Sequence, residues 1–170
     1  MKTIPIILSK TGFDLLIEQL RTDLENSSYS PKTFPAVKKG IRETKTFPEC
    51  YMNDGTIESI AIIPDNSENY FIFFEKGNAN FDEYNGLNNY DFSLIAWFNL
   101  KSLDENKTYD FSEEIIKEII DILNGFNSTN IVCQYNYNFQ DYSLINQKKM
   151  QFLTYPYNSV KINCRIGASC

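Results

Sequence analysis

Apolar side chains recur every three to four residues in two stretches of the chain, and this spacing predicts two amphipathic helices. The first stretch begins after Ser9 or Thr11, either of which can cap a helix, and ends near Asn26. Its apolar positions are Phe13, Leu16, Leu20 and Leu24. Charged side chains occupy the rest of the cylinder, so we expect one face of this helix to be buried.

The second predicted helix begins after Asp110 or Ser112 and ends near Leu123, where Gly125 follows as a stop signal. Its apolar face is broad and consists of Ile115, Ile116, Ile119, Ile120, Ile122 and Leu123. Its outer face is mainly acidic, with Glu113, Glu114, Lys117, Glu118 and Asp121. A helix with one wide apolar face is expected to pack across a sheet.

Alternating or continuous apolar runs predict strands at 49–53, 56–63, 69–75, 89–100, 130–139 and 155–166. The sequence Asn53-Asp54-Gly55 favours a tight hairpin between the first two of them. The strand at 69–75 is apolar on both faces, which is typical of a central strand that is covered on both sides. A short apolar segment at 3–8 can form an edge strand or an arm, since Pro5 excludes a central position.

The strand at 89–100 has two different faces. One carries Tyr90, Phe92, Leu94, Ala96 and Phe98 and is expected to face the core. The other begins with polar side chains and becomes apolar at Ile95 and Trp97. This second face is therefore expected to be partly covered by a helix or to belong to an interface.

Two segments lack clear periodicity. Residues 27–48 contain three prolines, at 31, 35 and 48, and predict an extended basic arm or a long loop. Residues 76–88 hold two glycines and predict a projecting loop or a hairpin extension. With 170 residues the chain fits a single domain, 1–170. The predicted fold is α+β, a mainly antiparallel β-sheet or sandwich with two packed α-helices and the long arm.

Charge is distributed unevenly along the chain. The net charge is −6, which argues against a sequence-specific nucleic-acid binder, because neutralising phosphates needs a concentrated positive field. Residues 27–48 nevertheless carry five basic side chains against one acidic side chain, a net of +4, so the rest of the chain carries −10. No apolar run approaches the roughly 20 residues of a membrane span, and the N-terminus lacks a signal-peptide core, so neither membrane insertion nor secretion is expected.

The residues that most enzymes use are sparse. Histidine is absent, and so are the glycine-rich phosphate loops and the nucleophile elbow. The four scattered cysteines predict reduced thiols, and the acidic loops lack the spacing of an EF-hand. We therefore expect no enzymatic activity, no metal and no cofactor.

Three groups of residues are candidate protein–protein contacts. The basic group lies in the predicted arm and consists of Lys32, Lys38, Lys39, Arg42 and Lys45. The aromatic group consists of Phe81 and Tyr84, which stand in a polar loop with no strand partner to bury them. The acidic group lies on the outer face of the second helix and consists of Glu114, Glu118 and Asp121. The simpler alternative is a solvated loop and a solvated helix face.

The order of these elements resembles that of the small neck proteins of tailed bacteriophages, which include tail terminators, head-completion proteins and connector rings. The stretches that carry the resemblance are FSLIAWFNL at 92–100 and YPYNSVKINCRI at 155–166. Asn, Ile, Lys, Phe and Tyr together make 76 of the 170 residues, and their AT-rich codons are compatible with a crAss-like or other Bacteroidetes phage.

What the resemblance implies is a structural virion protein that forms a homo-oligomeric ring in the head-to-tail connector. Its partners would be its own copies and the neighbouring portal, connector or tail proteins, and it would be assembled in the host cytoplasm. A closed ring needs two different faces that meet, and the basic arm and the acidic helix are such a pair. The alternatives are a monomeric or dimeric cytoplasmic binding module from a mobile element and, less favoured, a carbohydrate-binding domain.

Overall fold

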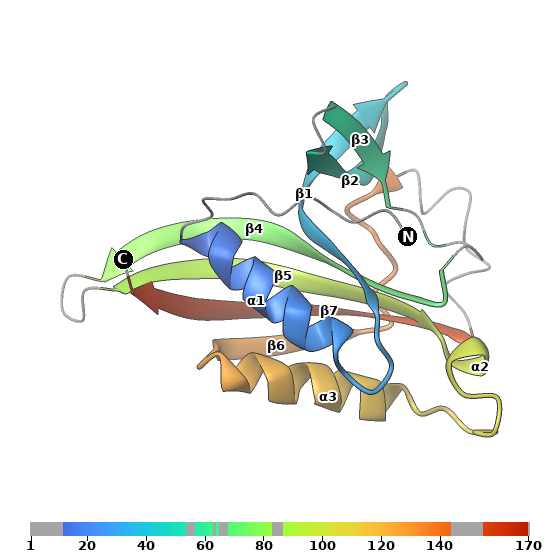
Figure 1. Ribbon diagram of the computed structural model, residues 1–170. Coiled ribbons are helices and arrows are strands. Elements are labelled where there is room, and N and C mark those ends of the chain that lie inside the picture. The colour runs from blue at the N-terminus through green and yellow to red at the C-terminus, as the bar shows by residue number, and fades with distance from the viewer. Residues whose placement is uncertain are drawn as a thin grey trace.

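The computed structural model describes residues 12–53, 57–62, 64, 68–82, 87–143 and 155–169 (Figure 1). Its helices are α1 (Phe13–Glu25), α2 (Leu100–Leu103) and α3 (Ser112–Gly125). Its strands are β1 (Lys32–Arg42), β2 (Lys45–Asn53), β3 (Ile57–Ala61), β4 (Tyr70–Asp82), β5 (Leu87–Asn99), β6 (Thr129–Tyr135) and β7 (Tyr157–Ser169). None of the helices in these ranges is long and apolar enough to cross a membrane.

The strands follow the order β3-β2-β1-β4-β5-β7-β6. Only β1 and β4 run parallel, and every other pair is antiparallel, so the fold is α+β with a mainly antiparallel sheet, as predicted. The first half of β1 pairs with β4, and its second half leaves the main sheet to pair with β2. The second half of β1, together with β2 and β3, therefore projects from the five-stranded sheet β1-β4-β5-β7-β6 (Figure 1).

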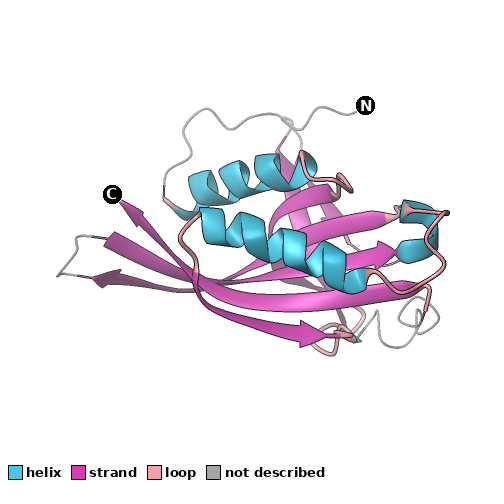
Figure 2. Cartoon of the chain, turned by 90° about the horizontal axis from the view of Figure 1, so that it is seen from below, coloured by secondary structure: helices cyan, strands magenta, loops and turns pink. Residues whose placement is uncertain are grey.

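Helices α1 and α3 lie side by side on one face of the sheet (Figure 2). They bury the apolar stripes that the sequence predicts, including Leu20, Leu24, Ile115 and Ile119. Beneath them lie the predicted core positions of β5, from Phe92 to Phe98, together with the matching positions of β4 and β7. The helix face is thus closed by two amphipathic helices.

The opposite face of the sheet has a second core. Phe71, Phe73, Ile95 and Trp97 are buried there under residues 136–143, hereafter the cover segment. Its side chains Tyr137, Phe139 and Tyr142 fill this core together with Phe34, Val37, Cys50 and Ile62. The prediction that Ile95 and Trp97 are covered by a helix or belong to an interface is therefore wrong, because an irregular segment of the same chain covers them.

The predicted boundaries need two further corrections. Residues 27–48 are not one irregular arm or loop, because β1 and β2 form a hairpin with Glu43 and Thr44 at its turn. Pro35 is accommodated where the register of β1 against β4 shifts, between Thr33 and Ala36. The strand expected at 130–139 ends at Tyr135, since Asn136 has a φ of 51° and turns the chain into the cover segment.

The other predicted irregular segment, 76–88, is largely a hairpin extension. Strand β4 continues to Asp82, and β5 begins at Leu87. The two strands remain paired to this limit, with Asp82 opposite Leu87. Tyr84 lies outside the described residues.

Candidate functional site

The predicted basic group lies on the hairpin of β1 and β2, hereafter the basic hairpin. Lys39 is exposed and Lys45 is half-buried, while the side chains of Lys38 and Arg42 lie outside the described part of the chain. Lys32 forms an ion pair with Glu68 and lies over the ring of Phe34. Lys32 is thus engaged within its own chain, and Lys39 is the described member of the group that is most open to a partner.

The apolar residue Ile41 stands near the tip of the basic hairpin and is 71% exposed. Phe81 is 59% exposed near the end of the β4–β5 hairpin, but it lies on β4 opposite Asn88, so the predicted loop position without a strand partner is wrong. These two hairpins leave the body of the molecule in different directions (Figure 1). Large apolar side chains at projecting tips are typical contact residues, because docking would remove them from water.

The acidic group lies on the outer face of α3, where each carboxylate already has a partner in the chain. Glu114 accepts hydrogen bonds from Lys107 and from the Tyr109 hydroxyl. Glu118 accepts two hydrogen bonds from Ser28, one from the backbone and one from the hydroxyl. Asp121 pairs with Lys117 at 2.5 Å. The first and last of these carboxylates keep about half of their side-chain surface in water, 49% for Glu114 and 59% for Asp121.

The edge strand β6 is a contact surface that the sequence analysis missed. Val132 is 60% exposed and Tyr135 is 56% exposed, and they stand on the last strand of the sheet. An edge strand presents unpaired backbone groups along one side, so it can pair with another chain. The available signal was Val132, an apolar residue among the polar positions of an otherwise alternating strand.

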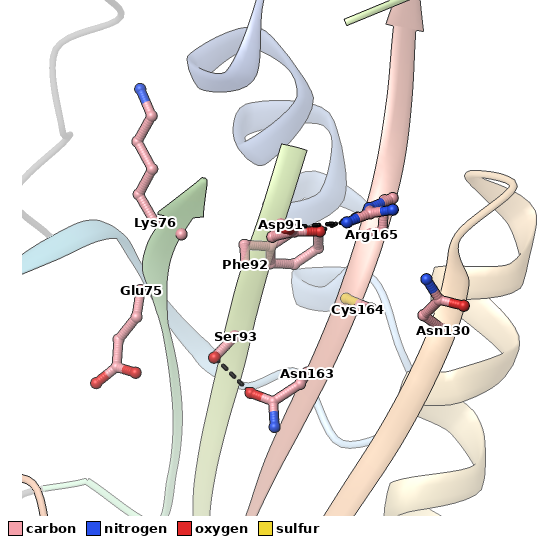
Figure 3. A pocket seen from close by; sticks show the side chains of 10 residues that line it. Glu75, Lys76, Asp91, Phe92, Ser93, Asn130, Asn163, Cys164 and Arg165 are labelled. Atoms are coloured by element: carbon pink, nitrogen blue, oxygen red, sulfur yellow. Dashed lines mark hydrogen bonds and ion pairs between the residues drawn. The ribbon is translucent and has the colours of Figure 1, made fainter. Parts of the chain in front are cut away.

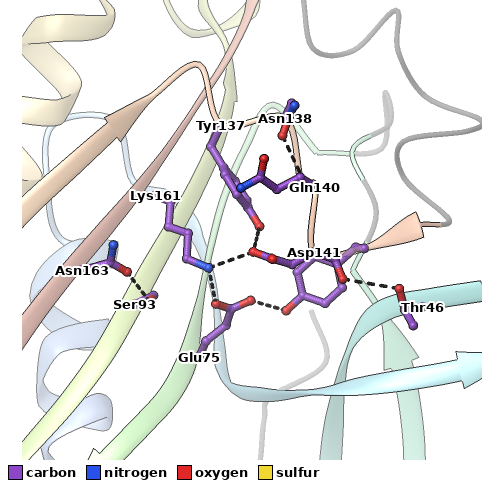
Figure 4. A network of polar contacts seen from close by, with 10 residues as sticks. Thr46, Glu75, Ser93, Tyr137, Asn138, Gln140, Asp141, Lys161 and Asn163 are labelled. Carbon is purple, nitrogen blue, oxygen red and sulfur yellow. Dashed lines mark hydrogen bonds and ion pairs between the residues drawn. The ribbon is translucent and has the colours of Figure 1, made fainter.

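A network of polar side chains lies on the face of the sheet that carries the second core, where the cover segment meets the sheet (Figure 4). Lys161 of β7 binds Glu75 of β4 at 2.8 Å and Asp141 of the cover segment at 3.1 Å. Tyr137 donates its hydroxyl hydrogen to Asp141 at 2.7 Å, and Tyr142 donates to Glu75. One lysine and two tyrosine donors thus bridge two carboxylates and tie the cover segment to two strands.

The pKa shifts in this network suit a structural clamp. Burial, reinforced by the carboxylate that each hydroxyl binds, raises the pKa of Tyr137 and of Tyr142 above the ordinary value of 10. The hydrogen bond from Tyr137 lowers the pKa of Asp141. For Lys161 burial acts to lower the pKa, but the hydrogen bonds and charges of Glu75 and Asp141 together outweigh it and raise the pKa. Each shift moves the group further from neutral pH, whereas acid–base catalysis needs a pKa near it.

A shallow depression of about 390 Å³ lies beside this network on the same sheet (Figure 3). Residues of four strands line it, among them Gly77, Ser93 and Asn163. A Cβ at Gly77 would stand 2.7 Å from the backbone oxygen of Asp91, so only glycine allows β4 and β5 to approach here. The depression therefore combines a close backbone approach with larger side chains such as Lys76 and Phe92.

The carboxylates and the guanidinium group of the depression are already paired. Asp91 and Arg165 stand opposite each other on β5 and β7 and form two hydrogen bonds, of 2.7 and 3.2 Å. The bond from Arg165 lowers the pKa of Asp91. Ser93 donates to Asn163 at 2.6 Å. Lys76 also lines the depression and lies over the ring of Phe13, and tyrosine does not occur among the described residues of the lining.

Comparisons with protein-family models, with curated proteins and with solved structures gave no match. Function is therefore argued from the surfaces of this chain.

Proposed function

We propose that this protein is a structural subunit that acts through protein–protein contacts and forms a homo-oligomeric ring in the neck of a tailed phage. The observation that supports it best is the position of the two charged surfaces. The basic hairpin stands at one side of the molecule, and α3 with the edge strand β6 stands at the other (Figure 1). A head-to-tail contact between copies would bring the two surfaces together, as a closed ring requires.

Exposed apolar residues add to this support. Ile41 lies beside the basic residues of the hairpin, and Val132 and Tyr135 lie on β6, the edge strand that follows the acidic helix in the chain. Interfaces combine apolar anchors with a charged rim, and both surfaces have these two components. The contact partners under this proposal are other copies of the chain in the ring, and portal, connector or tail proteins above and below it in the virion.

The test is to reverse the charge of the basic hairpin. Replacing Lys38, Lys39 and Arg42 by Glu should abolish assembly, because like charges would then face α3 of the next copy. Mass photometry measures the ring, and Lys101→Glu on α2 is the matched control, a charge reversal away from both surfaces. An unchanged oligomer in the triple variant would exclude this interface.

A ring that forms only on its template needs a second measurement. A zero-length carbodiimide joins lysines to carboxylates in direct contact, and a mixture of ¹⁵N-labelled and unlabelled protein identifies links between copies. We expect a mixed-isotope link from Lys39 to a carboxylate of α3. Links within single copies only, with a monomer at every concentration, would favour the cytoplasmic binding module.

A further inference from the structure

Three aromatic rings surround the ammonium group of Lys107, which lies in the loop between α2 and α3. Its Nζ atom is 4.6 Å from the ring centre of Phe111, 5.7 Å from that of Tyr29 and 5.9 Å from that of Tyr109. All three distances fall within the roughly 6 Å over which a ring face attracts a cation. By comparison, Lys76 and Lys161 lie over Phe13 and Tyr137, respectively. We call the group around Lys107 the cage.

The rings of the cage hold one another in place. Tyr29 and Phe111 are stacked with centres 5.7 Å apart, and Tyr109 meets Phe111 edge-on at 6.3 Å and 75°. They come from separate parts of the chain, because Tyr29 follows α1 while the other two precede α3. Phe111 is buried as the floor, whereas Tyr109 is 54% exposed as an outer wall. The cage is thus preformed and opens to solvent.

Two polar groups complete the cage. The Tyr29 hydroxyl accepts a hydrogen bond from Lys107 at 3.0 Å, and the Glu114 carboxylate accepts another. Tyr109 donates its hydroxyl hydrogen to the same carboxylate at 3.0 Å, which fixes both groups. The bond to Glu114, followed by the bond to Tyr29, raises the pKa of Lys107, so its ammonium is charged throughout the physiological range. A primary ammonium group therefore finds ring faces, an acceptor hydroxyl and a counter-charge here.

We propose that the cage is a binding site for primary alkylammonium groups, in which Lys107 is a tethered occupant that an external ammonium can replace. The chemistry is that of a lysine side chain from another chain or of a free alkylamine. Lys107 competes with such a ligand at a high effective concentration, because it is attached to the same loop. A weak ligand at low concentration therefore does not displace Lys107, whereas a ligand that is concentrated or held nearby does. This inference does not depend on ring assembly.

Removal of the tethered occupant is the direct test. In Lys107→Ala the rings and Glu114 remain, and methylammonium at constant ionic strength should bind saturably with a dissociation constant on the order of 10–100 mM. Chemical shifts of ¹³C-labelled tyrosine rings report binding at Tyr29 and Tyr109. The wild type should bind at least about fivefold more weakly. Lys39→Ala, which removes an exposed lysine from the basic hairpin on the other side of the molecule (Figure 1), should match the wild type.

Two other probes define the ligand class. Tetramethylammonium should bind Lys107→Ala more weakly than methylammonium, since it cannot donate hydrogen bonds to Tyr29 and Glu114; equal or tighter binding would overturn the assignment to primary amines. N-acetyl-lysine N-methylamide represents a protein side chain. Binding of either primary amine supports the site, and the tighter of the two identifies its source.

The proposal fails if folded Lys107→Ala shows no saturable shift with methylammonium, or if the wild type binds equally well. If the variant does not fold, the wild type itself provides the test. The rings should shift the Lys107 Hε resonances away from those of free lysine, and added methylammonium should move them back as Lys107 leaves. With the fivefold penalty the wild-type dissociation constant is on the order of 50–500 mM, so resonances that stay in place up to about 1 M methylammonium would overturn the proposal.

Discussion

The two faces of the sheet are closed by different kinds of structure. Helices α1 and α3 cover one face, and their contacts with the sheet are mainly apolar, apart from Arg21 and Glu25 of α1, which bond Thr33 of β1. The cover segment closes the other face with large rings, from Phe71 and Trp97 below to Tyr137 and Phe139 above. Polar contacts between the cover segment and the sheet surround the second core. Over the first core, the outer surfaces of the two helices are mainly charged.

The difference follows from how each cover satisfies its backbone. A helix pairs its own N–H and C=O groups, but an irregular segment needs partners elsewhere. The cover segment finds them in two places: Tyr137 donates its N–H to the carbonyl of Ser159 at 3.2 Å, and Ser143 donates its N–H to the Thr46 hydroxyl at 2.9 Å. The network around Lys161 adds side-chain bonds to the same segment. We therefore interpret these polar residues as the contacts that hold the cover segment on the second core.

The largest expected effect is at Trp97, which is fully buried between Phe71 and Tyr157, with ring centres 5.3 and 5.5 Å away. Trp97→Ala should lower the free energy of unfolding by about 3–5 kcal/mol, because it leaves a large cavity in the second core. Urea unfolding followed by circular dichroism measures the loss. Val132→Ala on the exposed edge should cost less than about 0.5 kcal/mol. A loss below about 1.5 kcal/mol at Trp97 would mean that the second core is not part of the cooperative fold.

The sequence predicts the strands and faces that carry strong local patterns. The two-sided burial of β4 and the core face of β5 are confirmed, since an alternation of side chains is recorded in the sequence itself. The wet face predicted for β7 is only partly correct, because Ser159 is buried and Lys161 is largely covered by the cover segment. The basic hairpin is missed because its turn uses Glu43 and Thr44, with φ of 47° and 69°, in place of the glycine or asparagine that marks such turns. Its fold depends on pairing that local composition does not reveal.

The cover and the cage could not be predicted from local patterns. Tyr142 and Glu75, which bond in the clamp, are 67 positions apart, and Tyr29 and Lys107 are 78 apart. Each tyrosine alone looks like an ordinary strand or loop residue. Only the fold brings the hydroxyl groups to their partners. Ile41 is not among the predicted contact residues, yet it is the most exposed large apolar side chain among the described residues of the basic hairpin.

A smaller effect is expected when the clamp loses its shared cation. Lys161→Met should cost about 1–3 kcal/mol, because Glu75 and Asp141 then face each other without a counter-charge in a partly buried site. Lys117→Met, which breaks the exposed pair with Asp121, should cost less than about 0.5 kcal/mol. The fluorescence of Trp97, the single tryptophan, reports the second core during urea unfolding. Equal losses in the two variants would refute the clamp.

The smallest effect is a change in alkaline stability. The pKa of Tyr142 is raised above 10 in the folded protein, chiefly by burial, so the stability that its neutral form provides is complete below pH 10 and is lost as the pH rises. Between pH 10 and 11 the wild type should therefore lose about 1 kcal/mol more than Tyr142→Phe, which has no proton to release. Urea unfolding at the two pH values measures the difference. The control Tyr135→Phe, on the exposed edge, should lose as much stability between these pH values as the wild type. If Tyr142→Phe also lost as much, the Tyr142 hydroxyl would titrate freely and would not hold the cover segment in place.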